Sequence, residues 1–393
     1  MKLLALVLAL ALFSCTPSPP SAPPPVVAPQ APTPAPPWPA GLPVYDHIVI
    51  VVMENKDYED IIGNPAAPYI NGTLRREGAN LTQMYAEEHH SQGNYFWLFS
   101  GSNQNVKFQD RIPRHPLDAS NLGEQLLRAG HSFKGYAEDL PAIGSRVEQS
   151  ERYARKHVPW ISFANLPNGT TVADSSNLRF QDFPSDYRAL PTIAFVIPNL
   201  VNDMHNPGLP PPIQAGDTWL REHIDGYYTW AKQHNSLLIL TFDEDSHLRE
   251  GLTNPADADP AHRNHIVTIL AGAHIKPGDY PEGKGVTHVN LLRTLEAMYK
   301  LKKSGVQQQY ALQAGITDDF IIIDVFDVEA RASRGASSHQ TRQSQDAVSA
   351  QASCGHQGVP ASAWPQVGEL RQSQPGLPGL CTQNDPLSGV LVQ

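Results

Sequence analysis

The sequence has little positive charge. Its 393 residues include 29 lysines and arginines against 39 aspartates and glutamates, which gives a formal net charge of −10 and a pI near 5.9. Proteins that bind the phosphate backbone of nucleic acids usually present a basic surface, so this composition argues against nucleic acid as a partner. An anionic substrate would need a local positive centre within the protein.

Apolar runs long enough to cross a membrane are also missing. The run from Leu3 to Phe13 has eleven residues, whereas a membrane-spanning helix needs about 20. It follows Lys2 and precedes Ser14-Cys15, which is the layout of a signal peptide. Leu12-Phe13-Ser14-Cys15 also resembles a bacterial lipobox, although Phe13 stands where a smaller residue is usual. Residues 1–15 therefore predict export, either as a lipoprotein anchored to the membrane of the cell envelope through lipidated Cys15 or as a secreted protein.

Cysteine is scarce, with three in the whole chain. Once Cys15 is set aside, Cys354 and Cys381 remain, and disulfides can persist in an exported protein. The sequence does not decide whether these two cysteines form a disulfide, and nothing in the core depends on it.

Composition divides the chain into four parts. After residues 1–15, the segment 16–43 has 13 prolines among 28 residues, which predicts an extended polyproline II linker of about 90 Å. Residues 44–328 have a globular composition and form the predicted catalytic domain. Residues 329–393 are rich in Ser, Gln, Ala, Gly and Pro, with Trp364 as their single aromatic residue, and predict a disordered tail.

Short apolar runs alternate with helical patterns throughout the globular part. The runs are IVIVVM (48–53), FKGYA (133–137), TIAFVI (192–197), LLILTF (237–242) and HIVTILAG (265–272), with a further strand near 81–86. Nearly continuous apolar strands separated by helices indicate a sheet that is covered on both faces. The predicted fold class is α/β, a doubly wound α/β/α sandwich with a largely parallel central sheet.

Polar residues follow these runs directly. They are Glu54-Asn55, Glu138-Asp139, Asn199 with 202–205, Asp243-Glu244-Asp245, and the segment 87–91. Ligands of open α/β sheets bind beyond the carboxyl ends of the strands, so these side chains predict one site. Carboxylates, an amide and a hydroxyl are oxygen ligands that suit one hard divalent ion such as Mg²⁺, Ca²⁺ or Mn²⁺, which would supply the missing positive charge.

Nine motifs carry a resemblance to a known family. They are MEN (53–55), APYIN (67–71), HHSQGNYFWLFSG (89–101), YAEDLP (136–141), YARKHVPW (153–160), IPNLVNDMH (197–205), GDTWL (216–220), TFDED (241–245) and THVNLLRTLEAMY (287–299). In this order, over about Asp46 to Phe326, the chain resembles the bacterial phosphoesterases, which unite secreted acid phosphatases with phospholipases C. The resemblance implies an alkaline-phosphatase-like fold and an acid phosphatase acting on phosphate monoesters, phosphoinositides and their lipid head groups among them.

The resemblance also implies roles for individual residues. Glu54, Asn55, Asp243 and Glu244 match the metal-binding positions, and Ser91, also a metal ligand, matches the nucleophile that would form a phosphoserine. The family block H-P-S-x-P-N-Y reads His89-His90-Ser91-Gln92-Gly93-Asn94-Tyr95 here, so both of its prolines are replaced.

Other polar residues have expected roles in binding or proton transfer. Asn94 and the amides opening a helix near Tyr95–Phe99 would point donors at the phosphate. His205 and His288 match positions that contact phosphate or protonate the leaving group. Two interpretations remain for Lys156 and His157: a contact to phosphate, or a basic turn that faces solvent.

Three other functions stay open beside the phosphomonoesterase. A phospholipase C-type phosphodiesterase differs only in the room it needs for a second alkyl group. A Ser-His-Asp acyl hydrolase would normally show G-x-S-x-G, which is absent around Ser91. A lipoprotein that binds a metal or a partner without catalysis is the third. The sequence also lacks GxxxxGK[ST], which argues against nucleotide hydrolysis coupled to work.

Overall fold

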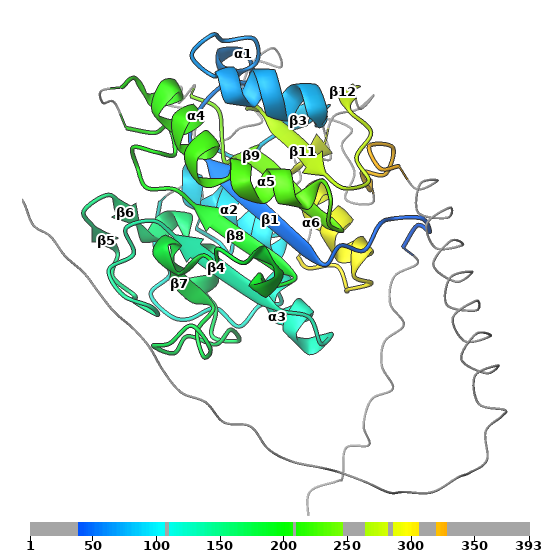
Figure 1. Cartoon of the computed structure of the whole chain (residues 1–393). Helices are drawn as coiled ribbons and strands as arrows, with labels where there is room; N and C mark the ends of the chain where they lie inside the picture. The colour runs from blue at the N-terminus through cyan, green and yellow to red at the C-terminus, as the bar shows by residue number, and fades with distance from the viewer. Residues whose placement is uncertain are drawn as a thin grey trace, which may run out of the picture. The chain divides into compact units, whose positions relative to one another are not determined.

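An eight-stranded sheet forms the centre of the computed structural model, in the order β12-β2-β11-β9-β1-β8-β4-β7 (Figure 1). Its strands have the following bounds: β1 His47–Met53, β2 Ala79–Leu81, β4 Phe133–Ala137, β7 Asn177–Arg179, β8 Ile193–Ile197, β9 Ser236–Phe242, β11 Thr268–Gly272 and β12 Gly278–Tyr280. Strands β9, β1, β8, β4 and β7 are parallel neighbours, whereas β11 runs antiparallel to both β9 and β2. The predicted α/β class with a largely parallel sheet is confirmed.

The central strands are buried on both faces. Ile48 to Met53 in β1 and all of β8 and β9 are buried, as the unbroken apolar runs predicted. Register is set along the whole length of β1, where Val49 pairs with Leu238 on one side and Ala194 on the other. This alignment brings the carboxyl ends of β1, β8 and β9 to one edge of the sheet.

Helices cover both faces of the sheet. Helices α4 and α5 lie on the face toward the viewer in Figure 1, α2 and α6 lie behind the strands, and α3 contacts β4 and α2. The α-helices are α1 Tyr58–Ile61, α2 Ser91–Ser100, α3 Leu122–Arg128, α4 Pro212–His223, α5 Asp225–Ala231 and α6 His288–Met298. Shorter turns are η1 Ile70–Arg75 (a π-helix), η2 Arg155–His157, η3 Pro159–Ser162, η4 Phe180–Asp182 and η5 Tyr187–Ala189. In the core, Phe99 of α2 packs edge-on against Phe195 of β8.

Two predicted strands are each divided in two. The run at 265–272 forms β10 (His265–Ile266) and β11, and the strand near 81–86 forms β2 and β3 (Met84–Tyr85). Strands β10, β3 and β13 (Val286–Thr287) make a separate three-stranded sheet, and β5 (Gln149–Ser150) pairs with β6 (Tyr153–Ala154). At each break the chain passes between the main sheet and the small one.

The structure describes residues 38–106, 110–206, 210–246, 264–281, 286–305 and 320–327. The predicted leader with Cys15, most of the linker, and the tail with Cys354 and Cys381 lie outside these ranges. Residues 38–43, which the sequence assigned to the linker, pack on the folded body, since Leu42 is buried and Trp38 Nε1 donates to the Leu301 carbonyl at 2.7 Å. Within the described ranges, helices are too short or too polar to cross a bilayer.

Candidate active site

Backbone hydrogen bonds join the carboxyl ends of three neighbouring strands. The Glu54 amide, just after β1, donates to the Asp203 carbonyl at 2.8 Å, and the Asp243 amide, just after β9, donates to the Met53 carbonyl at 3.0 Å. All three acidic side chains are buried, with at most 1% of their surface exposed. The expected convergence at the strand ends is therefore seen for β1, β8 and β9.

The two acids after β4 do not join the acid cluster but support the loop after β8. Glu138 accepts from the Asn199 amide at 2.9 Å and from Asn202 Nδ2 at 2.9 and 3.0 Å. Asp139 accepts from Asn199 Nδ2 at 2.8 Å. This strand end holds the loop that carries Asp203.

Ser91 lies between two carboxylates. Its Oγ is 3.1 Å from Glu54 Oε2 and 3.4 Å from Glu244 Oε1, and the side chain is buried. Ser91 is the first residue of α2, so the helix begins four residues before the predicted Tyr95. The predicted nucleophile and two predicted metal ligands are thus in hydrogen-bond contact.

The two departures from the family block fit the local backbone. His90 has φ 78°, a conformation closed to proline, whose ring fixes φ near −65°. Gly93 packs on Glu88, and a Cβ there would lie 1.6 Å from Glu88 Oε1. Glu88 in turn accepts from Asn103 Nδ2 at 2.9 Å. The turn into α2 is therefore built around a left-handed residue and a residue without a side chain.

Asn94 makes its hydrogen bonds to the loop before α2. Its Oδ1 accepts from the amides of Glu87 and Glu88, both at 3.0 Å, and its Nδ2 donates to the Glu88 carbonyl at 2.5 Å. These contacts shape the loop that leads to Ser91. A contact between Asn94 and phosphate stays a prediction.

Asn55, Asp243 and Glu244 are joined to one another and to Ser91. The Asn55 amide donates to Asp243 Oδ1 at 3.1 Å, and Asn55 Nδ2 donates to Glu244 Oε1 at 3.0 Å. Glu244 Oε2 accepts from the His90 amide at 2.8 Å and lies 3.0 Å from His89 Nδ1. The predicted ligand set thus forms one connected group.

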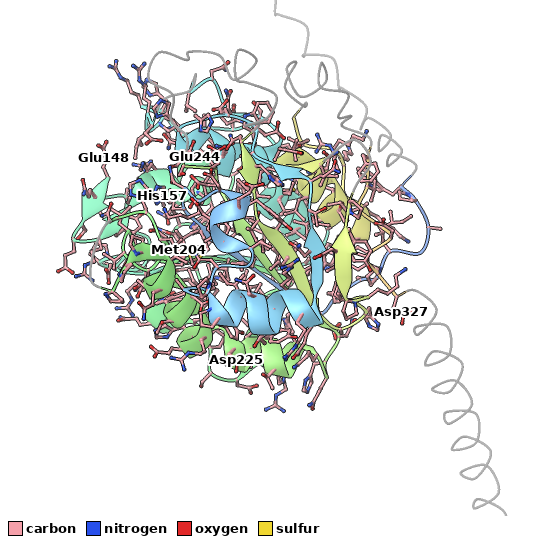
Figure 2. All side chains as sticks on the ribbon, turned by 90° about the horizontal axis from the view of Figure 1, so that it is seen from above. Glu148, His157, Met204, Asp225, Glu244 and Asp327 are labelled. Atoms are coloured by element: carbon pink, nitrogen blue, oxygen red, sulfur yellow. The ribbon has the colours of Figure 1, made fainter. Side chains whose placement is uncertain are left out.

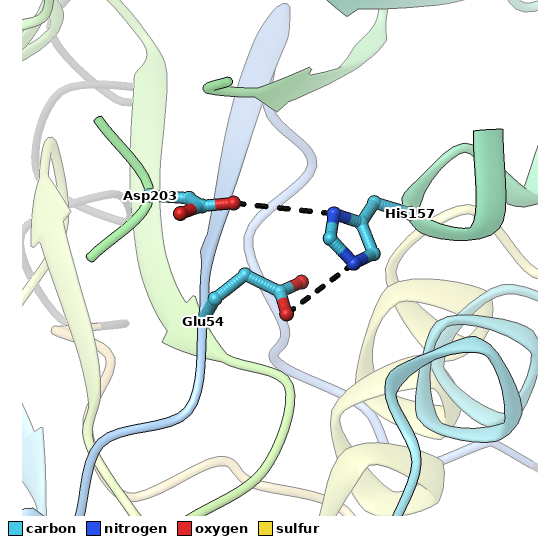
Figure 3. A group of neighbouring side chains, drawn as sticks. All are labelled: Glu54, His157 and Asp203. Atoms are coloured by element: carbon cyan, nitrogen blue, oxygen red, sulfur yellow. Dashed lines mark ion pairs between the residues drawn. The ribbon is translucent and has the colours of Figure 1, made fainter. Parts of the chain in front are cut away.

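The structure adds two residues that the sequence did not assign to the metal. His157, from η2, and Asp203 join Glu54 in a buried group whose candidate ligand atoms lie within 4.8 Å of one another (Figure 3). His157 Nε2 is 3.4 Å from Glu54 Oε2, and His157 Nδ1 is 3.9 Å from Asp203 Oδ2. Figure 2 shows His157, Met204 and Glu244 on the same side of the molecule. This Glu-His-Asp group could bind a metal ion.

Tyr95 holds two members of that group. Its hydroxyl donates to Glu54 Oε1, and its ring stacks on the His157 ring with centroids 5.3 Å apart. The hydrogen bond occupies one oxygen of Glu54 and leaves the other facing Ser91 and His157. Tyr95 is therefore a positioning residue of the cluster.

Crowding of buried acids shifts their pKa values. Burial, reinforced by the charge of Asp203, raises the pKa of Glu54 well above its usual value. Burial and the charge of Glu54 do the same to the pKa of Asp243, and burial also raises the pKa of Asp203. Burial lowers the pKa of His157 well below its usual value. A nearby cation would remove this penalty on the ionised acids.

Several buried polar atoms of the cluster lack hydrogen bonds to the described residues. These atoms are Asn55 Oδ1, His157 Nε2, Asp203 Oδ2 and Asp243 Oδ2. Buried polar atoms are normally paired, and each exception calls for an unseen partner. Three oxygens and one imidazole nitrogen directed into an acidic cluster fit a divalent metal ion.

The two predicted histidines differ in accessibility. His205 is partly exposed, its Nδ1 lies 2.8 Å from Asn206 Oδ1, and its ring is 6.5 Å from that of His157. His288 is buried at the start of α6, with Nε2 2.8 Å from the Phe242 carbonyl, and burial lowers its pKa to about 4. Their roles stay predictions, and the geometry places only His205 beside the Glu-His-Asp group.

Comparison with known proteins gives consistent matches. A model of the Phosphoesterase family matches residues 66–302. The phosphatidylinositol-3-phosphatase of Mycobacterium tuberculosis is 44% identical over 266 residues, which cover 68% of this chain and 81% of that protein. A probable acid phosphatase of Kluyveromyces lactis is 28% identical over 279 residues, covering 66% of this chain and 60% of that protein. The chain thus spans less than two thirds of the fungal relative.

A solved structure gives a weaker match. The chain is similar to a protein in the alkaline phosphatase superfamily from Vibrio parahaemolyticus, with a TM-score of 0.49 and 14% identity. The match covers 70% of this chain and 72% of that one.

Proposed function

The chain belongs to the Phosphoesterase family, and from this membership and the site we propose that it is a metal-dependent acid phosphatase that hydrolyses phosphate monoesters. The observation that carries the proposal is the position of Ser91 Oγ, 3.1 Å from Glu54 Oε2 inside a cluster of buried acids. A phosphorylated intermediate needs such a hydroxyl beside groups that can take its proton and balance charge.

Two overlapping groups of residues would hold the ion. Glu54 belongs to both: one contains His157 and Asp203, and the other contains the predicted ligands Asn55, Ser91, Asp243 and Glu244. An imidazole ligand favours first-row metals over Mg²⁺ and Ca²⁺, so among the predicted ions we propose Mn²⁺. When bound, the ion would supply positive charge to the serine oxygen and to the phosphoryl group.

The surrounding residues serve the serine in defined ways. The Ser91 hydroxyl proton has two acceptors within hydrogen-bond distance, Glu54 Oε2 and Glu244 Oε1. In the proposed reaction Oγ forms a bond to phosphorus while the bond from phosphorus to the ester oxygen breaks. The leaving oxygen takes a proton, for which His205 is the candidate donor. Water then hydrolyses the phosphoserine and releases inorganic phosphate.

The physiological substrate and location are further parts of the proposal. The mycobacterial relative is named a phosphatidylinositol-3-phosphatase, which supports a phosphoinositide head group as substrate. The apolar run at 3–13, followed by Cys15, supports export and anchoring by lipidation. A Cys15→Ala protein that remains as firmly bound to membranes as the parent would contradict the anchor.

The test compares three substrates with and without a chelator. Purified protein should hydrolyse p-nitrophenyl phosphate, lose that activity in EDTA and recover it with Mn²⁺. Turnover of bis-p-nitrophenyl phosphate above the monoester would instead indicate a phospholipase C-type diesterase. Turnover of p-nitrophenyl butyrate that survives EDTA would indicate an acyl hydrolase, and no turnover of any substrate would leave a binding protein.

A further inference from the structure

Lys156 lies at the border between the buried cluster and solvent. It precedes His157 in η2, and its side chain is 25% exposed. Its Nζ is 2.6 Å from Asp110 Oδ2, and the Asp110 side chain is 30% exposed. The pair is thus in contact with solvent, whereas the acids of the cluster are buried.

Asp110 connects that ammonium group to the turn carrying the nucleophile. While its Oδ2 holds Lys156, its Oδ1 accepts from the Gln92 amide at 3.1 Å. Gln92 directly follows Ser91. The Asp110 carboxylate thus fixes the Lys156 ammonium group relative to the first turn of α2.

The electrostatics place the charge of Lys156 within reach of the cluster. Burial lowers the pKa of Lys156, but the charges of Glu54 and Asp110 outweigh it and raise the pKa overall. The same ammonium group counteracts the raised pKa of Glu54 and of Asp203. Lys56, by contrast, donates from Nζ to the Asn55 carbonyl at 2.7 Å, so its ammonium group is turned to the backbone. Lys156 is held by a carboxylate that also binds the amide after Ser91, so it is the lysine whose position suits an anion at Ser91.

We propose that Lys156 contacts the phosphoryl group of the substrate and selects monoesters over diesters, with Asp110 as the residue that positions it. This rests on the proposed phosphatase function. A monoester carries up to two negative charges on its phosphoryl group near neutral pH, whereas a diester carries one. A second cation beside the metal site favours the more highly charged group, because attraction grows with charge.

The central experiment removes the charge of Lys156. Lys156→Gln should lower kcat/KM for p-nitrophenyl phosphate about 10- to 100-fold, the range for losing one charged hydrogen bond. Turnover of bis-p-nitrophenyl phosphate should change less than about threefold, since its single charge still has the metal site. Lys156→Arg should restore most of the monoester activity.

Asp110→Asn tests the positioning role. The amide oxygen can still accept from the Gln92 amide, but it holds Lys156 less firmly. We expect a smaller loss than in Lys156→Gln, expressed mainly in KM and confined to the monoester. An equal loss for both substrates would indicate a structural role for Asp110 and overturn its part of the proposal.

A matched control exists at the other end of the sheet. Lys232 pairs with Glu77 at 3.0 Å and lies just before β9, at the end opposite the site. Lys232→Gln should leave both activities unchanged. A loss confined to the monoester in this variant would show that the effect does not belong to Lys156 and would overturn the proposal.

Further outcomes separate this proposal from the proposed function. If the parent protein hydrolyses no monoester, both fail. If the parent does and Lys156→Gln loses monoester and diester activity equally, or loses neither, the selectivity proposal alone fails. Inhibition of monoester hydrolysis provides the test if Lys156→Gln unfolds or if the parent does not cleave the diester. In that case Asp110→Asn should weaken inhibition by inorganic phosphate more than inhibition by dimethyl phosphate. Equal weakening of both, or no weakening, would overturn the proposal.

Discussion

The protein contains two groups of buried charged side chains, and the charges that surround them are opposite in sign. In α6, Arg293 and Glu296 are both fully buried, and Arg293 Nη1 lies 2.7 Å from Glu296 Oε2. The Ser304 amide donates to Glu296 Oε1, and Arg293 Nη2 donates to the Ser304 carbonyl. Beyond the carboxyl ends of β1, β8 and β9, acids face acids: burial, reinforced by the neighbouring carboxylates, raises the pKa values of Glu54, Asp203 and Asp243.

The difference lies in what surrounds each carboxylate. Burial raises the pKa of both Glu296 and Glu54, but the next influence on Glu296 is the positive charge of Arg293, whereas for Glu54 it is the negative charge of Asp203. A buried charge without a partner costs several kcal/mol, so a fold keeps one only where a ligand compensates it. The α6 pair carries its own counter-ion, whereas the acid cluster has the charge that the proposed cation would balance.

The largest expected effect comes from removing the hydroxyl inside the acid cluster. Ser91→Ala should lower turnover of p-nitrophenyl phosphate by about 10⁴- to 10⁶-fold, as loss of a covalent nucleophile does. Divalent metal should still bind, since the acids remain, and isothermal titration would measure this. Labelled phosphate from substrate, trapped by acid quench, should appear on the Ser91 peptide of the parent alone. Near-parental turnover would mean that water attacks phosphorus directly.

Changing the metal-binding group should have the next largest effect. Glu54→Ala, Asp243→Ala and His157→Ala each remove one candidate ligand and should weaken Mn²⁺ binding at least about 100-fold, because the loss should exceed the 10–100-fold typical of residues that only support a ligand. Glu138→Gln is the control, because Glu138 lies outside the proposed ligand set and accepts from the 199–202 loop and from Trp219. This variant should bind metal more tightly than the other three. If metal content stays at the parental level in all three ligand variants, the site lies elsewhere.

The sequence predicted the strands because their signal is local. Nearly unbroken runs of apolar residues are typical of strands buried on both faces, and they became β1, β8, β9 and β11. The more mixed run FKGYA became β4. The breaks between β10 and β11 and between β2 and β3 depend on which sheet each piece joins. Pairing with distant strands decides that, and no local pattern encodes it.

The site was predictable where its residues follow strands. Glu54 and Asp243 follow β1 and β9 directly, so the parallel sheet alone brings them together. His157 comes from a short 3₁₀ turn about a hundred positions further along the chain than Glu54, and only tertiary packing places it there. Its one sequence signal is the basic pair Lys156-His157 close to Val158 and Trp160, because Val and Trp are more typical of a core than of a solvated turn.

Breaking the buried Arg293–Glu296 ion pair should destabilise the protein. Glu296→Gln leaves the Arg293 charge buried without its counter-ion, which costs about 3–5 kcal/mol and lowers the melting midpoint by roughly 10 °C. Metal affinity should not change, because this pair lies outside the cluster. Glu222→Gln, which removes an exposed partner of Arg221, is the matched control and should melt like the parent. A Glu296→Gln midpoint within about 2 °C of the parent would show that the pair contributes little to stability.

Removing one acid from the Glu54–Asp203–Asp243 cluster should have the smallest effect, and it should stabilise the protein instead of destabilising it. In EDTA, Asp203→Asn removes one of the mutually repelling acids and should stabilise the protein by about 1–3 kcal/mol at pH 8. Because the folded-state pKa values of Glu54, Asp203 and Asp243 are raised, the folded protein binds more protons than the unfolded chain above about pH 4, so stability falls as pH rises toward those values. His157, with its lowered pKa, costs stability only as pH falls below about 6.5, and it does so in both proteins. Melting curves from about pH 5 to pH 8 should therefore fall less steeply for Asp203→Asn than for the parent, and Mn²⁺ should reverse the order of stability. Parallel curves in EDTA would mean that these acids are compensated without a metal, and the contrast with the α6 pair would not hold.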